Sequence, residues 1–196
     1  MSTTTSSKKS VASTTDLALI ATFAALIAVC AVSAAIPFGV NGVDLTLQLF
    51  AIFLAGAVLG AKRGFLAVVL YLAVGAAGLP IFSGGSSGVA SFTGLTGGYL
   101  WAFPFAALIV GFVVERAHRI NVAITAVVVV IGGLFAEVVV WIAGATGIAL
   151  YAETPWWTTV KSSFLYVPAD LVKLAVAAIV AAAVHRAFPA LLSKRG

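Results

Sequence analysis

Long hydrophobic runs separated by short polar connections dominate the chain. Six of these runs are long enough, or nearly so, to cross a hydrocarbon core of about 30 Å as α-helices. Proline and glycine mark several of their ends, as at Gly78-Leu79-Pro80. The pattern predicts an all-α integral membrane protein with six transmembrane helices, over Asp16–Ile36, Leu45–Ala61, Gly64–Leu79, Gly97–Val114, Ile120–Leu150 and Ser163–Ala187.

Composition supports a membrane location. The chain has 196 residues, of which 62% are hydrophobic and only 9% charged. No soluble domain of this size can bury so much apolar surface, so lipid must act as the solvent for much of it. We expect a disordered cytoplasmic tail over residues 1–15, a six-helix membrane domain over residues 16–190 and a basic cytoplasmic tail over residues 191–196.

The distribution of positive charge predicts the orientation. Nine of the eleven lysines and arginines lie on one side of the predicted helices, and only Lys161 lies in a connection on the other side. Because Lys and Arg accumulate on the cytoplasmic side, both termini are predicted to be cytoplasmic in a multi-pass plasma-membrane protein. The outer loops are then Pro37–Asp44, Pro80–Thr96 and Tyr151–Ser162.

Asp170 and Lys173 lie three residues apart within the last apolar run. At this spacing both side chains project from the same face of a helix. Ionisable groups at bilayer depth are costly unless they are paired or line a polar cavity. The two residues therefore form either a structural ion pair or part of a site that binds a polar molecule.

Other polar and aromatic residues are predicted at the same outer depth. Together with the Asp170–Lys173 pair they indicate an outward-facing pocket for a small polar ligand. They are Thr46, Gln48, Tyr99, Glu137 and Trp141.

Catalytic chemistry has little support in the sequence. The histidines, His118 and His185, fall on the cytoplasmic side, and the chain has a single cysteine, Cys30. We therefore predict no catalytic residues, no metal site and no enzyme activity. The chain also lacks a Gly-rich nucleotide-binding signature, so it cannot hydrolyse ATP itself.

The first predicted helix carries a stripe of small residues that includes Ala21, Ala25 and Ala28. Small side chains at this spacing let another membrane helix approach closely. The neighbour is either another helix of the same bundle or a helix of a partner subunit.

Several segments resemble the biotin-specific substrate-binding component, the BioY family of S-components, of energy-coupling factor (ECF) transporters. The chain departs from the usual family pattern at Asp44 and Leu95, where proline is common, and at Ala169, where glycine is common; these changes concern loop rigidity. The matching segments, which are specific as a set, are Leu45-Thr46-Leu47-Gln48, Tyr71 with Gly75-Ala76-Ala77-Gly78-Leu79-Pro80, Gly84-Gly85-Ser86-Ser87-Gly88, Thr96-Gly97-Gly98-Tyr99-Leu100-Trp101 and Pro168-Ala169-Asp170-Leu171-Val172-Lys173.

The resemblance implies high-affinity capture of biotin at the outer face, without a cofactor. It also implies two kinds of partner, a transmembrane coupling subunit and cytoplasmic ATPases that hydrolyse ATP. The face formed by Ala21, Ala25 and Ala28 would be the surface on which the coupling subunit docks. In such a site Asp170 can accept the ureido N–H groups, Lys173 can donate to a carbonyl, and Tyr99 or Trp141 can pack on the bicyclic ring. Backbone N–H groups of Gly84, Gly85, Ser86 and Gly88 can hold an anion.

Three alternatives remain at this point. The chain could bind a different vitamin within the same transporter class. It could be a proton-coupled carrier in which Asp170, Lys173 and Glu137 act as a relay. It could also be a membrane enzyme acting on lipid with Glu137 or Asp170 as a base, although the absence of a nucleophile argues against this.

Overall fold

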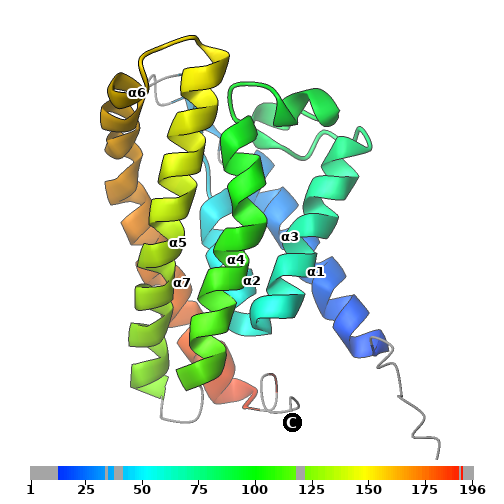
Figure 1. The fold of residues 1–196 in the computed structure, drawn as a ribbon. Helices are drawn as coiled ribbons and strands as arrows, with labels where there is room; N and C mark the ends of the chain where they lie inside the picture. Colours follow the sequence, from blue (N-terminus) through cyan, green and yellow to red (C-terminus); the bar gives the residue numbers. More distant parts are fainter. Residues whose placement is uncertain (1–12, 34, 38–41, 118–121, 190, 192–196) are drawn as a thin grey trace, which may run out of the picture.

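The computed structural model describes residues 13–33, 35–37, 42–117, 122–189 and 191, so most of the two predicted tails lies outside the described residues. The described part is a bundle of helices with short loops (Figure 1). In chain order its elements are α1 (Thr14–Val32), β1 (Ile36–Pro37), β2 (Asp44–Leu45), α2 (Gln48–Leu59), α3 (Ala61–Ala76), η1 (Ser83–Gly85), η2 (Val89–Phe92), α4 (Gly97–Ala117), α5 (Val122–Tyr151), α6 (Trp156–Ser163), η3 (Phe164–Tyr166) and α7 (Val167–Ala187).

Four helical stretches in the described residues are long and apolar enough to cross a membrane. They are α1, α4, residues 123–151 of α5, and the continuous run of α6, η3 and α7. Their outer surfaces carry many exposed apolar side chains, such as Phe135, Val172 and Ile179. Such a surface is stable in lipid but not in water, so the fold is that of a multi-pass membrane protein.

Helix α2 is the centre of the bundle. It contacts α1, α3, α4 and α7, and nearly all of its residues are buried. Glycines allow the close approach, because a Cβ at Gly56 would overlap the backbone of Ala107 on α4. The turn into α3 requires glycine at position 60, where φ is +81°, and Glu115 Oε1 accepts a hydrogen bond of 3.0 Å from the N–H of Ala61.

Most predicted helix boundaries shift by a few residues. Helix α1 ends at Val32 rather than at residue 36, because Ile36 and Pro37 pair with Leu45 and Asp44 in a short antiparallel strand pair. Helix α2 accordingly starts later than predicted, at Gln48. Helix α3 is displaced toward the N-terminus, and α4 and α5 extend slightly beyond their predicted C-terminal ends.

The third predicted outer loop, Tyr151–Ser162, is wrong for most of its length. Residues Trp156–Ser163 form helix α6, which continues through η3 into α7. The helix begins after Pro155, where φ is already fixed near its helical value. Its mixture of tryptophans with threonines, Lys161 and serines looks like a polar loop in a hydropathy pattern, but it suits an amphipathic helix at one end of the bundle.

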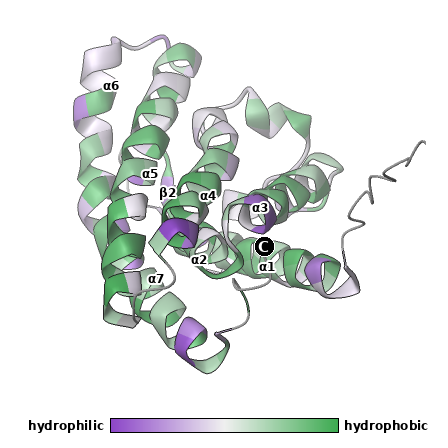
Figure 2. Cartoon of the chain, turned by 60° about the horizontal axis from the view of Figure 1, so that its bottom comes forward, coloured by the Kyte–Doolittle hydropathy of each residue, from purple (hydrophilic) through white to green (hydrophobic). Residues whose placement is uncertain are grey.

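Positive charge gathers at the end of the bundle where α3 begins and α4 and α7 end (Figure 1). The described cations there include Lys62, Arg63, Arg116 and Arg186. Figure 2 turns this end forward and shows hydrophilic positions near the helix ends and hydrophobic positions along the helices. This arrangement agrees with the predicted grouping of charge on one side.

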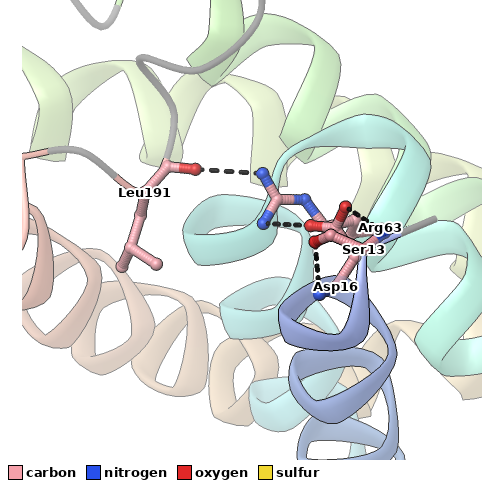
Figure 3. Close-up of polar contacts among 4 residues, drawn as sticks. All are labelled: Ser13, Asp16, Arg63 and Leu191. Atoms are coloured by element: carbon pink, nitrogen blue, oxygen red, sulfur yellow. Dashed lines mark hydrogen bonds and ion pairs between the residues drawn. The ribbon is translucent and has the colours of Figure 1, made fainter. Parts of the chain in front are cut away.

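Arg63 ties three segments together at this basic end (Figure 3). Its Nη1 lies 3.0 Å from Asp16 Oδ1, and its Nη2 donates a hydrogen bond of 3.1 Å to the carbonyl of Leu191. Asp16 also forms a capping box with Ser13, which is the N-cap of α1. The start of α1 is therefore held against the start of α3 and the end of the described chain.

Candidate ligand-binding site

A cavity lies at the opposite end of the bundle, beneath β2 and η1. Its empty space, counted together with its open mouth, is about 640 Å³. Residues of α2, α4, α5 and α7 form its walls. Residues of two connections cover it, namely the connection before α2, with Val43 and Asp44, and the loop after α3, with Phe82 and Ser83. The lining consists of Val43, Asp44, Leu45, Thr46, Gln48, Leu49, Phe82, Ser83, Thr96, Tyr99, Leu100, Phe103, Val140, Tyr166, Asp170 and Lys173.

Asp170 and Lys173 line this cavity as an ion pair. Lys173 Nζ lies 2.6 Å from Asp170 Oδ1, and the two side chains are only 10% and 13% exposed. The first turns of α7 bring both side chains to the same face, as the i, i+3 spacing predicts. The two residues therefore form a salt bridge with each other and also contribute to the polar wall of a cavity. Both alternatives from the sequence, a structural ion pair and part of a binding site, fit this geometry.

Gln48 and Thr46 enter the cavity from the start of α2. Gln48 is 4% exposed, and its Nε2 donates a hydrogen bond of 2.8 Å to the hydroxyl of Tyr71. Tyr71 in turn donates to the carbonyl of Ile81 at 3.2 Å. This chain of hydrogen bonds fixes the amide of Gln48 and leaves its carbonyl oxygen for a ligand.

Tyr99 supplies an aromatic wall from the first turn of α4. Space for its ring exists because residue 144 of α5 is glycine, where a Cβ would overlap the ring. The same two helices approach closely at Gly98 and Gly147, where added Cβ atoms would meet backbone atoms of the opposite helix. The glycines of α5 therefore position Tyr99 against the cavity.

The remaining predicted ligand-binding residues do not line the cavity. Gly84, Gly85, Ser86 and Gly88 lie in the loop that follows α3, adjacent to the lining residue Ser83. Trp141 points toward α6, where its Nε1 donates a hydrogen bond of 3.2 Å to the carbonyl of Val160.

Glu137 also lies outside the lining, one helical turn before Val140, which does line the cavity. It is 6% exposed, and its Oε2 has no hydrogen-bond partner among the described residues. Such a buried carboxyl oxygen is unusual, because buried polar atoms are almost always paired.

Sequence reasoning missed the residues that close the cavity from the loops. Ser83 of η1 donates a hydrogen bond of 3.3 Å to Asp44 Oδ2. Tyr166 of η3 donates one of 2.8 Å to the carbonyl of Val43. These two hydrogen bonds link the connection before α2 to the loop after α3 and to the segment before α7. In the sequence, only the polar character of Asp44 indicated that these residues could take part in a site.

Comparisons with known proteins agree with this architecture. The chain is 37% identical to the biotin transporter BioY of Rhodobacter capsulatus, over 92% of this chain and 98% of that protein. It is 35% identical to the biotin transporter BioY of Rhizobium etli, over 91% and 97% of the two chains. The fold matches a crystal structure of the S-component for biotin from an ECF-type ABC transporter, with a TM-score of 0.79, 28% identity and coverage of 88% of this chain and 91% of that chain.

The family model for BioY matches residues 2–190, which is almost the whole chain. The match includes every helix of the described bundle and both connections that cover the cavity. By this match, and by its full-length similarity to curated relatives, the chain belongs to the BioY family.

Proposed function

We propose that this chain is the biotin-binding membrane subunit of an ECF-type uptake transporter in the plasma membrane. The observation that carries the proposal is the partly buried Asp170–Lys173 pair in the wall of a cavity, in a chain of the BioY family. The protein binds and releases its ligand without chemical change, so it acts as a transport subunit and not as an enzyme.

In the proposed complex Asp170 accepts hydrogen bonds from the ureido N–H groups of biotin. Lys173 keeps Asp170 ionised and donates to the ureido carbonyl, since its ammonium group has three donors. Tyr99 packs on the apolar bicyclic ring, and Gln48 and Thr46 complete the polar wall. The backbone N–H groups of Gly85, Ser86 and Gly88 already donate to the carbonyls of Phe82, Ser83 and Gly75, so of the predicted anion-binding amides that of Gly84 remains a candidate. Trp141 remains a candidate for a ring contact after movement of α6.

The proposed membrane arrangement has six helices and cytoplasmic termini. Helices α2 and α3 have 12 and 16 residues, too few to span the full hydrocarbon core of about 30 Å. Helix α2 is shielded inside the bundle, whereas α3 exposes apolar side chains such as Leu66 and Leu70. The loops that flank the two helices can complete the crossing where protein surrounds the backbone. In the proposed arrangement the basic end of the bundle, which carries Lys62, Arg63, Arg116 and Arg186, lies in the cytoplasm. The cavity at the opposite end then opens toward the outside of the cell.

The proposed partners are a transmembrane coupling subunit and cytoplasmic ATPases, with the Ala21, Ala25 and Ala28 face of α1 as the docking surface. Ala21 and Ala25 are exposed in the described structure and Ala28 is half-buried. Because only five of the 19 residues of α1 are buried inside the bundle, this helix has surface available for a second helix.

The test is isothermal titration of the purified protein with biotin, compared with the Asp170→Asn variant. We expect one biotin per chain and a loss of at least about tenfold in affinity for the variant, because a hydrogen bond to a charged group contributes roughly 1.5–3 kcal/mol. Asp16→Asn is the matched control at the opposite end of the bundle and should leave affinity unchanged. Equal affinity of a folded Asp170→Asn protein would contradict the assigned role.

A proton-coupled carrier is the second candidate, and the buried carboxyl group of Glu137 is the observation that favours it. Cellular uptake with and without the ATPase subunits separates the two functions. Uptake that stops without ATPases supports the ECF function. Uptake that persists without them and stops when the proton gradient is dissipated supports the carrier.

A further inference from the structure

Besides the Lys173 ammonium group, the cavity offers free hydrogen-bond acceptors to a ligand. Several of its donors already bind protein atoms: Gln48 Nε2 binds Tyr71, Ser83 Oγ binds Asp44, and the Tyr166 hydroxyl binds Val43. Acceptor atoms remain, because the described residues form no hydrogen bond to Asp44 Oδ1 or to Asp170 Oδ2.

The charge of the lining is also acidic. The charged lining residues are two carboxylates, Asp44 and Asp170, and one ammonium group, Lys173. Lys173 already pairs with Asp170 at 2.6 Å. Asp44 has no cation within salt-bridge distance in the described structure, and its partner there is the neutral hydroxyl of Ser83.

Asp44 lines the cavity from a loop segment. It belongs to β2, in the connection before α2, and contacts η1 through Ser83. Asp170 and Lys173 line the cavity from α7, whereas Asp44 lines it from the connection before α2. A ligand that fills the cavity with its N–H groups on Asp170 therefore also meets the part of the lining that contains Asp44.

From this geometry we infer that Asp44 is a specificity-determining residue, which disfavours ligands with an anionic outer end and favours ligands with a neutral or cationic one. The inference rests on the proposed function, because it takes the ureido group to bind Asp170. Free biotin ends in a carboxylate. An amide of biotin, such as biotin joined to an amine that carries an ammonium group, replaces that repulsion with attraction to Asp44.

The test measures the affinities of three ligands that share the ureido ring and differ at the other end. They are biotin, an anion; biotin methyl ester, which is neutral; and N-(2-aminoethyl)biotinamide, a cation. Each is titrated into the unmodified protein, Asp44→Asn and Ser83→Ala. Asparagine keeps the size of the side chain and an acceptor for Ser83, removes the charge, and replaces the second carboxylate oxygen with a neutral N–H donor group.

For Asp44→Asn we expect the affinity for biotin to rise and the affinity for the cation to fall, each by about threefold to tenfold. This is the range expected for one charge roughly 10 Å away in partly solvated surroundings. The methyl ester should change by less than about twofold, and both charge effects should shrink at high salt. Ser83→Ala keeps the charge of Asp44 and should leave the ratio of the three affinities unchanged.

Two results would overturn the inference. An equal loss for all three ligands would mean that Asp44 binds the shared ureido ring, and an equal affinity before and after substitution would mean that Asp44 lies beyond the reach of the ligand. Failure of the proposed function gives a different result, since the unmodified protein would then bind none of the three ligands.

Discussion

The ring of Phe82 occupies the space that a Cβ on Gly75 would fill. Phe82 is 2% exposed and lines the ligand cavity, although it belongs to the loop after α3. Its ring also packs edge-to-face on Tyr71, with centroids 5.5 Å apart. The absence of a side chain at position 75 therefore anchors the loop over the cavity.

Gly75→Ala should displace Phe82 and lower both stability and biotin affinity. Overpacking of a buried site costs about 1–3 kcal/mol, which the thermal midpoint of unfolding in detergent will report as a decrease. Phe82→Leu in the same chain frees space, so the double variant should lose less than the sum of the two single variants. Additive losses would show that the two positions do not interact.

The hydrogen bond between Tyr166 of η3 and Val43, which precedes β2, gives a second prediction. Tyr166→Phe removes the hydroxyl that donates the 2.8 Å hydrogen bond to the carbonyl of Val43 and keeps the ring. A neutral hydrogen bond contributes about 0.5–1.5 kcal/mol, so biotin affinity should fall by roughly twofold to tenfold. Titration of Tyr151→Phe, at an exposed tyrosine on α5, provides the matched control. If Tyr166→Phe binds as tightly as the control, this contact does not shape the site.

The loop between α3 and α4 should exchange its amide hydrogens more slowly when biotin is bound. Its amides at Phe82 and Gly88 are hydrogen-bonded to Ser86 and to Gly75, and residues 82 and 83 line the cavity. A ligand beneath the loop stabilises the closed form, which offsets the entropy cost of ordering its glycines. Exchange at Leu17, near the other end of the bundle, should not change. Identical protection of the loop with and without biotin would exclude a gating role.

The sequence predicted what depends on local spacing. The Asp170–Lys173 pair follows from two residues on one helical turn, and long apolar runs reveal α1, α4 and α5 without knowledge of their neighbours. These features need only helix periodicity and the thickness of a bilayer.

Contacts between distant segments could not be predicted in this way. Ser83 meets Asp44 across 39 residues and Tyr166 meets Val43 across 123 residues, so each contact depends on the packing of the whole bundle. From the sequence alone Asp44 bears only on loop rigidity, whereas in the structure it lines the cavity. Helix α6 was missed because its polar residues lower the hydropathy on which the prediction relied.

The exposed small residues of α1 give the last prediction. Ala25 is exposed, whereas its neighbour Ala24 is 7% exposed and belongs to the hydrophobic core. A partner helix can approach closely only where the crossing point carries nothing larger than a methyl group. Ala25→Trp should therefore abolish cellular uptake of biotin, and titration of the isolated variant should still show tight binding, since α1 contributes no residue to the cavity lining.

Ala24→Trp is the matched control for this experiment. It places the same bulk on the buried face of α1 and should reduce folding, so that uptake and binding are lost together. If Ala25→Trp behaves like Ala24→Trp, the exposed face of α1 packs within the bundle in the membrane. If Ala25→Trp transports biotin at the normal rate, the coupling subunit docks elsewhere. Only loss of uptake with retained binding supports docking at Ala21, Ala25 and Ala28, because it separates association with the partner from capture of the ligand.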